Sequence, residues 1–146
     1  MTRVAKFLRA PGSNKRLLVK STMLLFVVRV SLWILPFPVV QQILSKRARS
    51  SPVGPADPAS VARVAWAIGV GRRYTPNATC LTQALATEIL LRSIGQQASL
   101  LIGVARSAGG DFEAHAWVES NGGVVVGMTT DLSRYVVLSS RNGRSL

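Results

Sequence analysis

In this chain of 146 residues, the order of the apolar segments constrains the fold more than any other feature. Up to residue 95 the apolar residues lie in long segments typical of helices, and beyond residue 97 they form short runs typical of strands. The helices are expected at 15–35, 39–46, 59–69 and 76–93, and the strands at 98–105, 114–119, 124–126 and 135–138. Helices followed by strands that glycine turns connect predict an α+β fold, in which the helices pack on an antiparallel meander.

Prolines divide the front of the chain from the rest. Pro36 and Pro38 disfavour continuation of the first helix, and residues 50–59 hold three prolines and a glycine. Asp57 followed by Pro58 then favours a helix start, with the aspartate as N-cap. We therefore expect four parts: a flexible basic N-terminus (1–14), a basic apolar helical segment (15–49), a linker (50–58) and a main domain (59–146).

The apolar run from 21 to 40 has nearly the length of a membrane span. Arg29 splits it, and a charge at the bilayer centre costs at least about 2.5 kcal/mol. The run also lacks the small-residue cleavage site of a signal peptide. We expect a buried or partner-contacting helix here, with attachment to a membrane surface as the less favoured alternative.

Positive charge is concentrated in the front of the chain. The whole sequence carries 18 Lys and Arg against 6 Asp and Glu, a net charge of +12. Residues 1–60 hold ten basic residues and one acid, a net of +9, whereas residues 61–146 hold eight and five, a net of +3. Such a front is typical of a solvated face, or of a surface for an acidic protein or an anionic membrane. No nucleic-acid partner is expected, because no zinc-finger or aromatic RNA-binding motif occurs.

The chain has one cysteine and one histidine. Cys80 lies at the head of the predicted helix 76–93, where the helix dipole and free N–H groups favour a thiolate, and His115 lies in the predicted strand 114–119. Together they predict a nucleophile and its base, although a lone cysteine is more often a small buried hydrophobe and a lone histidine a satisfied core residue. One cysteine excludes an internal disulfide, and the pair is too few for a structural zinc site, so neither metal nor cofactor is expected.

The sequence around both residues matches one pattern. It reads Cys80-x2-Gln-Ala-x5-Leu-Leu-x3-Gly, then Ile102-Gly-Val, then Ala114-His-Ala-Trp-Val-Glu, with Leu35-Pro-Phe in the front segment. This pattern resembles the transglutaminase-like, papain-related cysteine superfamily. Within that superfamily it is most similar to the leader peptidases of lasso-peptide biosynthesis.

The resemblance implies a transglutaminase-like cysteine-protease fold and a cytoplasmic peptidase, whose thiol must stay reduced. Cys80 would attack the bond between leader and core of a ribosomally made precursor, His115 would act as general base and acid, and the Cys80 backbone N–H could serve an oxyanion hole. The implied partners are the precursor peptide, a small leader-recognition protein and an asparagine-synthetase-like lasso cyclase. The segment 15–49 is the expected docking element.

The third catalytic residue departs from the family pattern. The family places an aspartate about a dozen residues after the histidine, where this chain has Gly127, and Asp131 lies four residues later. Asp131 is the first candidate, and Glu113 and Glu119 share the strand parity of His115. A Cys–His dyad with a backbone or threonine acceptor is the remaining alternative.

Two further side chains are candidates for substrate binding. Gln83 lies one helical turn after Cys80, and Trp117 lies two residues beyond His115 on the same strand face. A simple polar helix residue and a core tryptophan are the corresponding structural interpretations. For the whole chain, the alternatives to the peptidase are an acyltransferase or amidase of the same superfamily, and a non-enzymatic basic scaffold or peripheral membrane protein.

Overall fold

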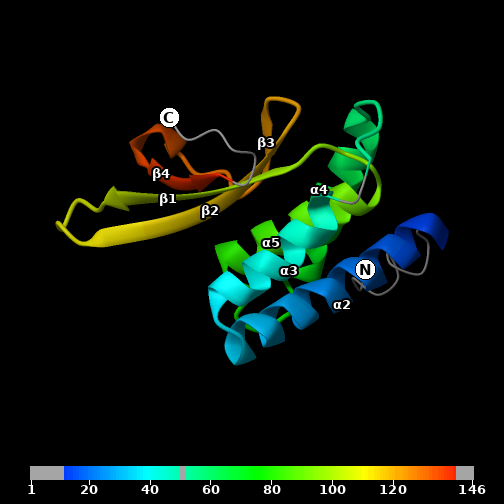
Figure 1. Cartoon of the computed structure of the whole chain (residues 1–146), viewed down its shortest axis with the longest axis horizontal. Helices are drawn as coiled ribbons and strands as arrows, with labels where there is room; N and C mark the ends of the chain where they lie inside the picture. Colours follow the sequence, from blue (N-terminus) through cyan, green and yellow to red (C-terminus); the bar gives the residue numbers. More distant parts are fainter. Residues whose placement is uncertain (1–11, 50–51, 141–146) are drawn as a thin grey trace, which may run out of the picture.

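The structure is a computed structural model that describes residues 12–49 and 52–140. Its helices are α2 (Gly12–Ile34), α3 (Phe37–Arg49), α4 (Pro58–Gly71) and α5 (Cys80–Ser93). Its strands are β1 (Ser99–Arg106), β2 (Phe112–Ser120), β3 (Gly123–Val126) and β4 (Val136–Ser140), with a short 3-10 helix η1 (Leu132–Arg134) before the last strand. The helices lie on one side of the antiparallel sheet (Figure 1), so the predicted α+β class is confirmed.

The start of α4 follows the sequence prediction. Asp57 is the N-cap, and its Oδ1 accepts hydrogen bonds from the backbone N–H groups of Ala59 at 3.2 Å and Ser60 at 3.3 Å. Pro58, which has no N–H to satisfy, occupies the first helical position. A carboxylate thus occupies the positive end of this helix.

The start of α5 differs from the prediction by four residues. The expected helix 76–93 begins only at Cys80. Asn77 adopts a left-handed backbone conformation with φ of 54°, which no helix interior accommodates, and Thr79 is extended with ψ of 167°. Thr79 is therefore the N-cap, and Cys80 is the first residue of the helix.

The sheet corrects the predicted meander. The strand order is β3-β2-β1-β4, so β4 pairs with β1 and not with its predecessor β3. Gly127, with φ of 89°, turns the chain away after β3. The following residues cross the sheet on the side away from the helices, where the Tyr135 ring lies against His115 and Trp117, and then join the free edge of β1.

The core lies between the helices and the inner face of the sheet. All four helices and three of the strands contribute to it, with these buried or partly buried members among others: Leu25, Val28, Val40, Val64, Ile68, Leu85, Leu90, Leu91, Leu100, Ala116, Val118 and Val126. The front segment 15–49 and the main domain therefore share one core, because α2 packs on α4 and α5. Of the predicted flexible N-terminus, residues 1–11 lie outside the described residues and residues 12–14 begin α2.

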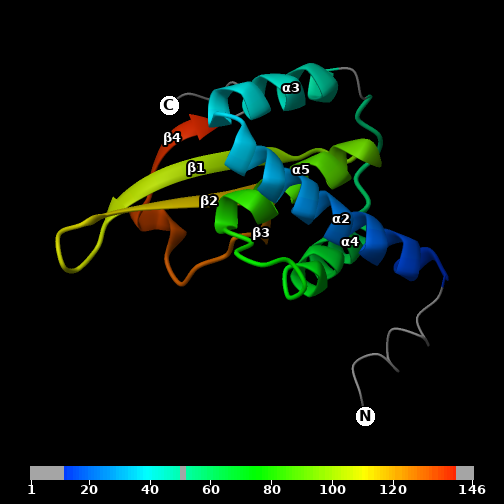
Figure 2. The ribbon, with the colours of Figure 1, turned by 90° about the horizontal axis from the view of Figure 1, so that it is seen from below.

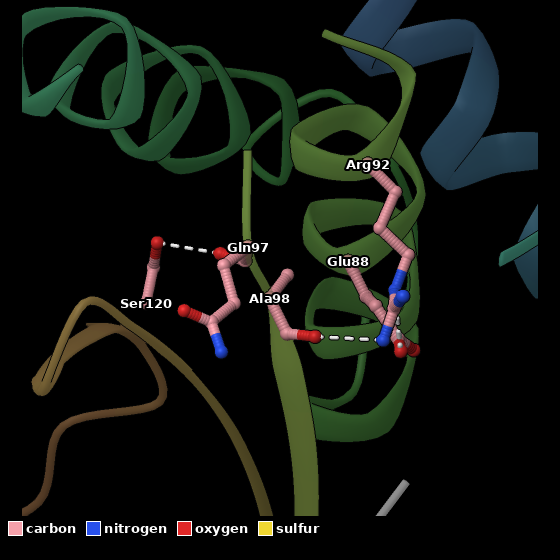
Figure 3. A network of polar contacts seen from close by, with 5 residues as sticks. All are labelled: Glu88, Arg92, Gln97, Ala98 and Ser120. Atoms are coloured by element: carbon pink, nitrogen blue, oxygen red, sulfur yellow. Dashed lines mark hydrogen bonds and ion pairs between the residues drawn. The ribbon is translucent and has the colours of Figure 1, made fainter. Parts of the chain in front are cut away.

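A polar network fastens the C-terminal end of α5 to the sheet (Figure 3). Arg92 pairs with the buried carboxylate of Glu88 at 3.2 Å and donates to the carbonyl oxygen of Ala98 at 2.8 Å. The Ser120 hydroxyl donates to the carbonyl oxygen of Gln97 at 2.6 Å. Because these bonds join α5, the start of β1 and the end of β2, they fix the helix that carries Cys80 relative to the strand that carries His115.

Candidate active site

Cys80 occupies the first position of α5 and is half-buried against the core. The Thr79 side chain accepts from the N–H of Thr82 at 3.3 Å, and the Thr79 carbonyl accepts from the N–H of Gln83 at 3.0 Å. Within the described ranges, the N–H groups of Cys80 and Leu81 carry no hydrogen bond, and the first turn of α5 holds no acidic residue. The thiol therefore lies beside unused donors at the positive end of a helix.

Gln83 braces the loop that leads to Cys80. Its side-chain Nε2 donates to the carbonyl oxygen of Ala78 at 2.9 Å, two residues before the cysteine. The bond ties the first turn of α5 to its approach segment and holds the Cys80 backbone in place. Substrate contact by Gln83 stays a prediction.

His115 lies in β2, opposite Gly103 of β1. Its ring Nε2 is 2.6 Å from the carbonyl oxygen of Gly127. A carbonyl oxygen can only accept, so Nε2 must carry the proton of this bond. The other ring nitrogen, Nδ1, is then unprotonated in the neutral imidazole and can accept a proton from a thiol.

Gly127 supplies this partner through its backbone, and its surroundings leave no room for a side chain. A Cβ atom at this position would lie 2.6 Å from the carbonyl oxygen of Ala116 and 2.7 Å from Cβ of Trp117. The positive φ of 89° disfavours any other residue as well. Where the family pattern has an aspartate, this chain offers a main-chain oxygen.

Asp131, the first sequence candidate for that role, lies elsewhere. Its carboxylate caps η1 and accepts from the N–H of Ser133 at 3.0 Å. The hydrogen bond from the Ser133 hydroxyl, together with this N–H, lowers the pKa of Asp131 below its usual range. Among the described residues the imidazole has Gly127 as its hydrogen-bond partner and the Asp131 carboxylate caps η1, so a catalytic role of Asp131 stays a prediction without a contact to support it.

The two glutamates on the same strand face are engaged with other groups. Glu113 accepts from the Arg134 guanidinium and from the Tyr135 hydroxyl, and these bonds, that of Arg134 foremost, lower its pKa. Glu119 accepts from the indole N–H of Trp117 at 3.1 Å. Among the described residues neither glutamate forms a hydrogen bond with His115, and each instead bonds to an aromatic side chain beside it.

Aromatic rings enclose the imidazole. Trp117 is buried and stacks with His115 at a centroid separation of 6.2 Å, and Tyr135 lies at 5.5 Å. These rings restrict the orientation of the imidazole. Sequence reasoning missed Tyr135, because its approach depends on the crossing that brings β4 to β1. Substrate contact by Trp117 stays a prediction.

The elements that carry Cys80 and His115 pack together. Helix α5 lies against β2 (Figure 1), with Ala116 and Val118 of the strand in the shared core. His115 and Trp117 alternate with these two residues and lie on the outer face. Strand β3 pairs with residues 118–120 of β2, and Gly127, which follows β3, lies against Ala116 and Trp117. The described residues contain no hydrogen bond between Cys80 and His115, and their catalytic pairing stays a prediction.

In the described ranges, no three His, Cys, Asp or Glu side chains gather closely enough to hold a metal ion. Comparison with curated proteins finds no match, and none is found among solved structures. A protein-family model described as the transglutaminase-like superfamily matches residues 23–140, which is most of the chain and includes α2 from Met23 onward. The chain therefore belongs to the transglutaminase-like superfamily, whose members are usually cysteine enzymes of the peptidase or transglutaminase kind.

Proposed function

We propose that this protein is a cysteine peptidase that removes the leader from a lasso-peptide precursor. The observation that supports it most is the bond between Nε2 of His115 and the carbonyl oxygen of Gly127, because it leaves Nδ1 unprotonated and able to accept a proton. The position of Cys80 supports its role as nucleophile. It is the first residue of α5, and the unbonded N–H groups of Cys80 and Leu81 are available to an oxyanion. The leader–core specificity rests on the sequence resemblance alone.

The proposed reaction has two steps. First, Nδ1 of His115 takes the Cys80 proton, and the sulfur attacks the carbonyl carbon that joins leader to core. The N–H of Cys80 donates to the oxyanion, and the imidazolium returns the proton to the departing core amine. In the second step a water, deprotonated by Nδ1, attacks the thioester and releases the leader with a free carboxylate. The net change is the addition of one water across one peptide bond.

The proposed partners follow from these products. The first step releases a core peptide with a free amino terminus, which a macrolactam-forming cyclase requires as its nucleophile. A separate recognition protein would hold the leader, because the described residues pack around a single core that also carries the proposed catalytic residues. The reaction needs a reduced thiol, so the proposed location is the cytoplasm.

Mass spectrometry of the purified full-length chain with precursor and recognition protein tests the proposal. We expect leader and core fragments whose masses sum to that of the precursor plus one water. Cys80→Ala should give no fragments, whereas Ser93→Ala, at the other end of α5, should cleave like the parent. Thermal melts check that both variants fold. Cleavage by Cys80→Ala at the parental rate would contradict the proposal.

The same acyl-enzyme could pass its acyl group to an amine instead of water, and the superfamily includes enzymes of that kind. Product mass separates the two reactions. A new amide bond with loss of ammonia, in place of the added water, would identify an acyltransferase. A Cys80 thiol that reacts with iodoacetamide no faster than free cysteine would favour a non-enzymatic protein.

A further inference from the structure

Helix α2 is apolar on both of its sides. On the inner side Leu18, Leu25 and Val28 are buried against the rest of the core. The opposite side, here called the outer face of α2, consists of large apolar side chains that are exposed: Val19, Met23, Phe26, Val27, Trp33 and Ile34. Trp33 is 81% exposed and Phe26 is 58% exposed.

A helix that is apolar all round is normally buried on all sides. α2 instead forms the layer of the molecule farthest from the sheet (Figure 1), and it lies over α4 and α5 when seen from below (Figure 2). Leu35, directly after α2, and Val39 and Ile43 of α3 are further exposed apolar side chains. Exposed apolar side chains gathered on one face of a helix are typical of an interaction surface.

The charges near the outer face have one sign. Lys15, Arg16 and Lys20 lie toward the start of α2, Arg29 lies within it, and Lys46 lies in α3. The sequence from residue 12 to residue 49 contains no aspartate or glutamate. Basic residues without acidic neighbours in the sequence, beside exposed apolar and aromatic side chains, complement an anionic lipid surface.

The packing of α2 determines whether it could cross a membrane or lie on its surface. By length and composition alone, α2 could cross a bilayer. Crossing would remove Leu25, which is fully buried, and Val28 from the core they share with α4 and α5. A helix held along one side by a protein core can instead lie in the plane of the interface, with its free apolar side among the headgroups and a tryptophan at its end.

We propose that the outer face of α2 binds the surface of an anionic membrane, with the helix parallel to the membrane plane. The sheet lies on the far side of the helical layer (Figure 1), so His115 would face away from the lipid. Membrane binding in this orientation does not depend on Cys80 or on the proposed peptidase activity. The two proposals can therefore fail separately.

Co-sedimentation of the full-length chain with vesicles tests the proposal. Vesicles of phosphatidylcholine with about one third phosphatidylglycerol should bind the protein, pure phosphatidylcholine should bind it far less, and added salt should weaken the binding. Phe26→Gln should lower the affinity at least about tenfold, because it removes one large side chain from the buried apolar area. Phe112→Gln makes the same change at a site that is 75% exposed at the start of β2, and it should bind like the parent.

Lys20→Gln gives an independent test if Phe26→Gln fails to fold. It should weaken binding to anionic vesicles about fivefold and leave the weak binding to phosphatidylcholine unchanged. Equal effects of Phe26→Gln and Phe112→Gln would overturn the proposal, as would absence of binding to the anionic vesicles. A dimer in sedimentation velocity that Phe26→Gln dissociates would overturn it in favour of a second copy. A lipid-independent complex with the recognition protein that Phe26→Gln disrupts would overturn it in favour of that protein.

Discussion

Cys80 and His115 have opposite kinds of surroundings. The ring of His115 is fixed by a hydrogen bond to the Gly127 carbonyl and by contacts with Trp117 and Tyr135. The thiol of Cys80 has no hydrogen-bond partner among the described residues, and the backbone donors next to it are unused. The His115 half of the candidate site is thus held by contacts within the protein, whereas the Cys80 half has backbone donors without a partner.

The difference follows from what each group would do. A base must present a defined nitrogen, so its other nitrogen has to be occupied. A nucleophile and its oxyanion hole must accept a substrate, so their groups have to stay free in the absence of one. The two helix starts show the same contrast, because the Asp57 carboxylate occupies the N-terminus of α4, while the neutral Thr79 leaves that of α5 open.

The largest effect is expected at the His115 half, from Gly127→Ala. The new Cβ would lie within 2.7 Å of two atoms and would hold a positive φ, so we expect a loss of about 2–5 kcal/mol in the free energy of unfolding. Displacement of the carbonyl should also lower the cleavage rate at least about 100-fold. Chemical denaturation and a cleavage assay measure the two effects.

Gly122→Ala is the matched control for that variant. Gly122 has a similar φ of 82°, but its added Cβ would meet no atom within 4 Å. It should cost about 1 kcal/mol and leave cleavage unchanged. If Gly127→Ala and Gly122→Ala changed stability and cleavage equally, the close packing around Gly127 would have no role in holding His115.

A smaller effect is expected at the Cys80 half, from Thr79→Asp. A carboxylate at the N-cap would stabilise α5 or leave its stability unchanged, yet it would place a negative charge beside the thiol. We expect the rate of alkylation of Cys80 at neutral pH to fall about tenfold. The reverse exchange at α4, Asp57→Thr, should cost at most about 1 kcal/mol in stability and leave the alkylation rate unchanged. If Thr79→Asp left the alkylation rate of Cys80 unchanged, the N-terminus of α5 would have no electrostatic effect on the thiol.

The smallest effect is expected from Asp131→Ala. This change removes the cap of η1 and should cost at most about 1 kcal/mol. Cleavage should stay within about threefold of the parent, since the imidazole keeps its partner, whereas loss of a true triad carboxylate lowers rates about 10,000-fold. A loss of about 10,000-fold in Asp131→Ala would instead identify Asp131 as the third catalytic residue.

Local signals in the sequence predicted much of the fold. The Asp57-Pro58 start of α4 and the apolar pattern of each element are each set by a few neighbouring residues, and the structure has them close to the expected places. The start of α5 was misplaced because the left-handed turn at Asn77 precedes the cap. The pairing of β4 with β1 joins residues more than thirty positions apart, and no local pattern specifies it.

The partner of His115 was only partly predictable. A backbone acceptor leaves no side-chain signature, so its one trace in the sequence is a glycine at the position where the family has an acid. The exposed apolar side of α2 could not be predicted either. Apolar residues lie on every side of this helix, so the sequence does not indicate which of them the core covers.

The rate at which Cys80 is alkylated by iodoacetamide, followed against pH in the parent and in His115→Ala, tests the central claim most directly. If the imidazole takes the thiol proton, the parent should react at least about tenfold faster at neutral pH, and the two rates should converge near pH 10, where thiols ionise without a base. Rates that coincide across the whole range would contradict the account, because Cys80 would then gain nothing from His115.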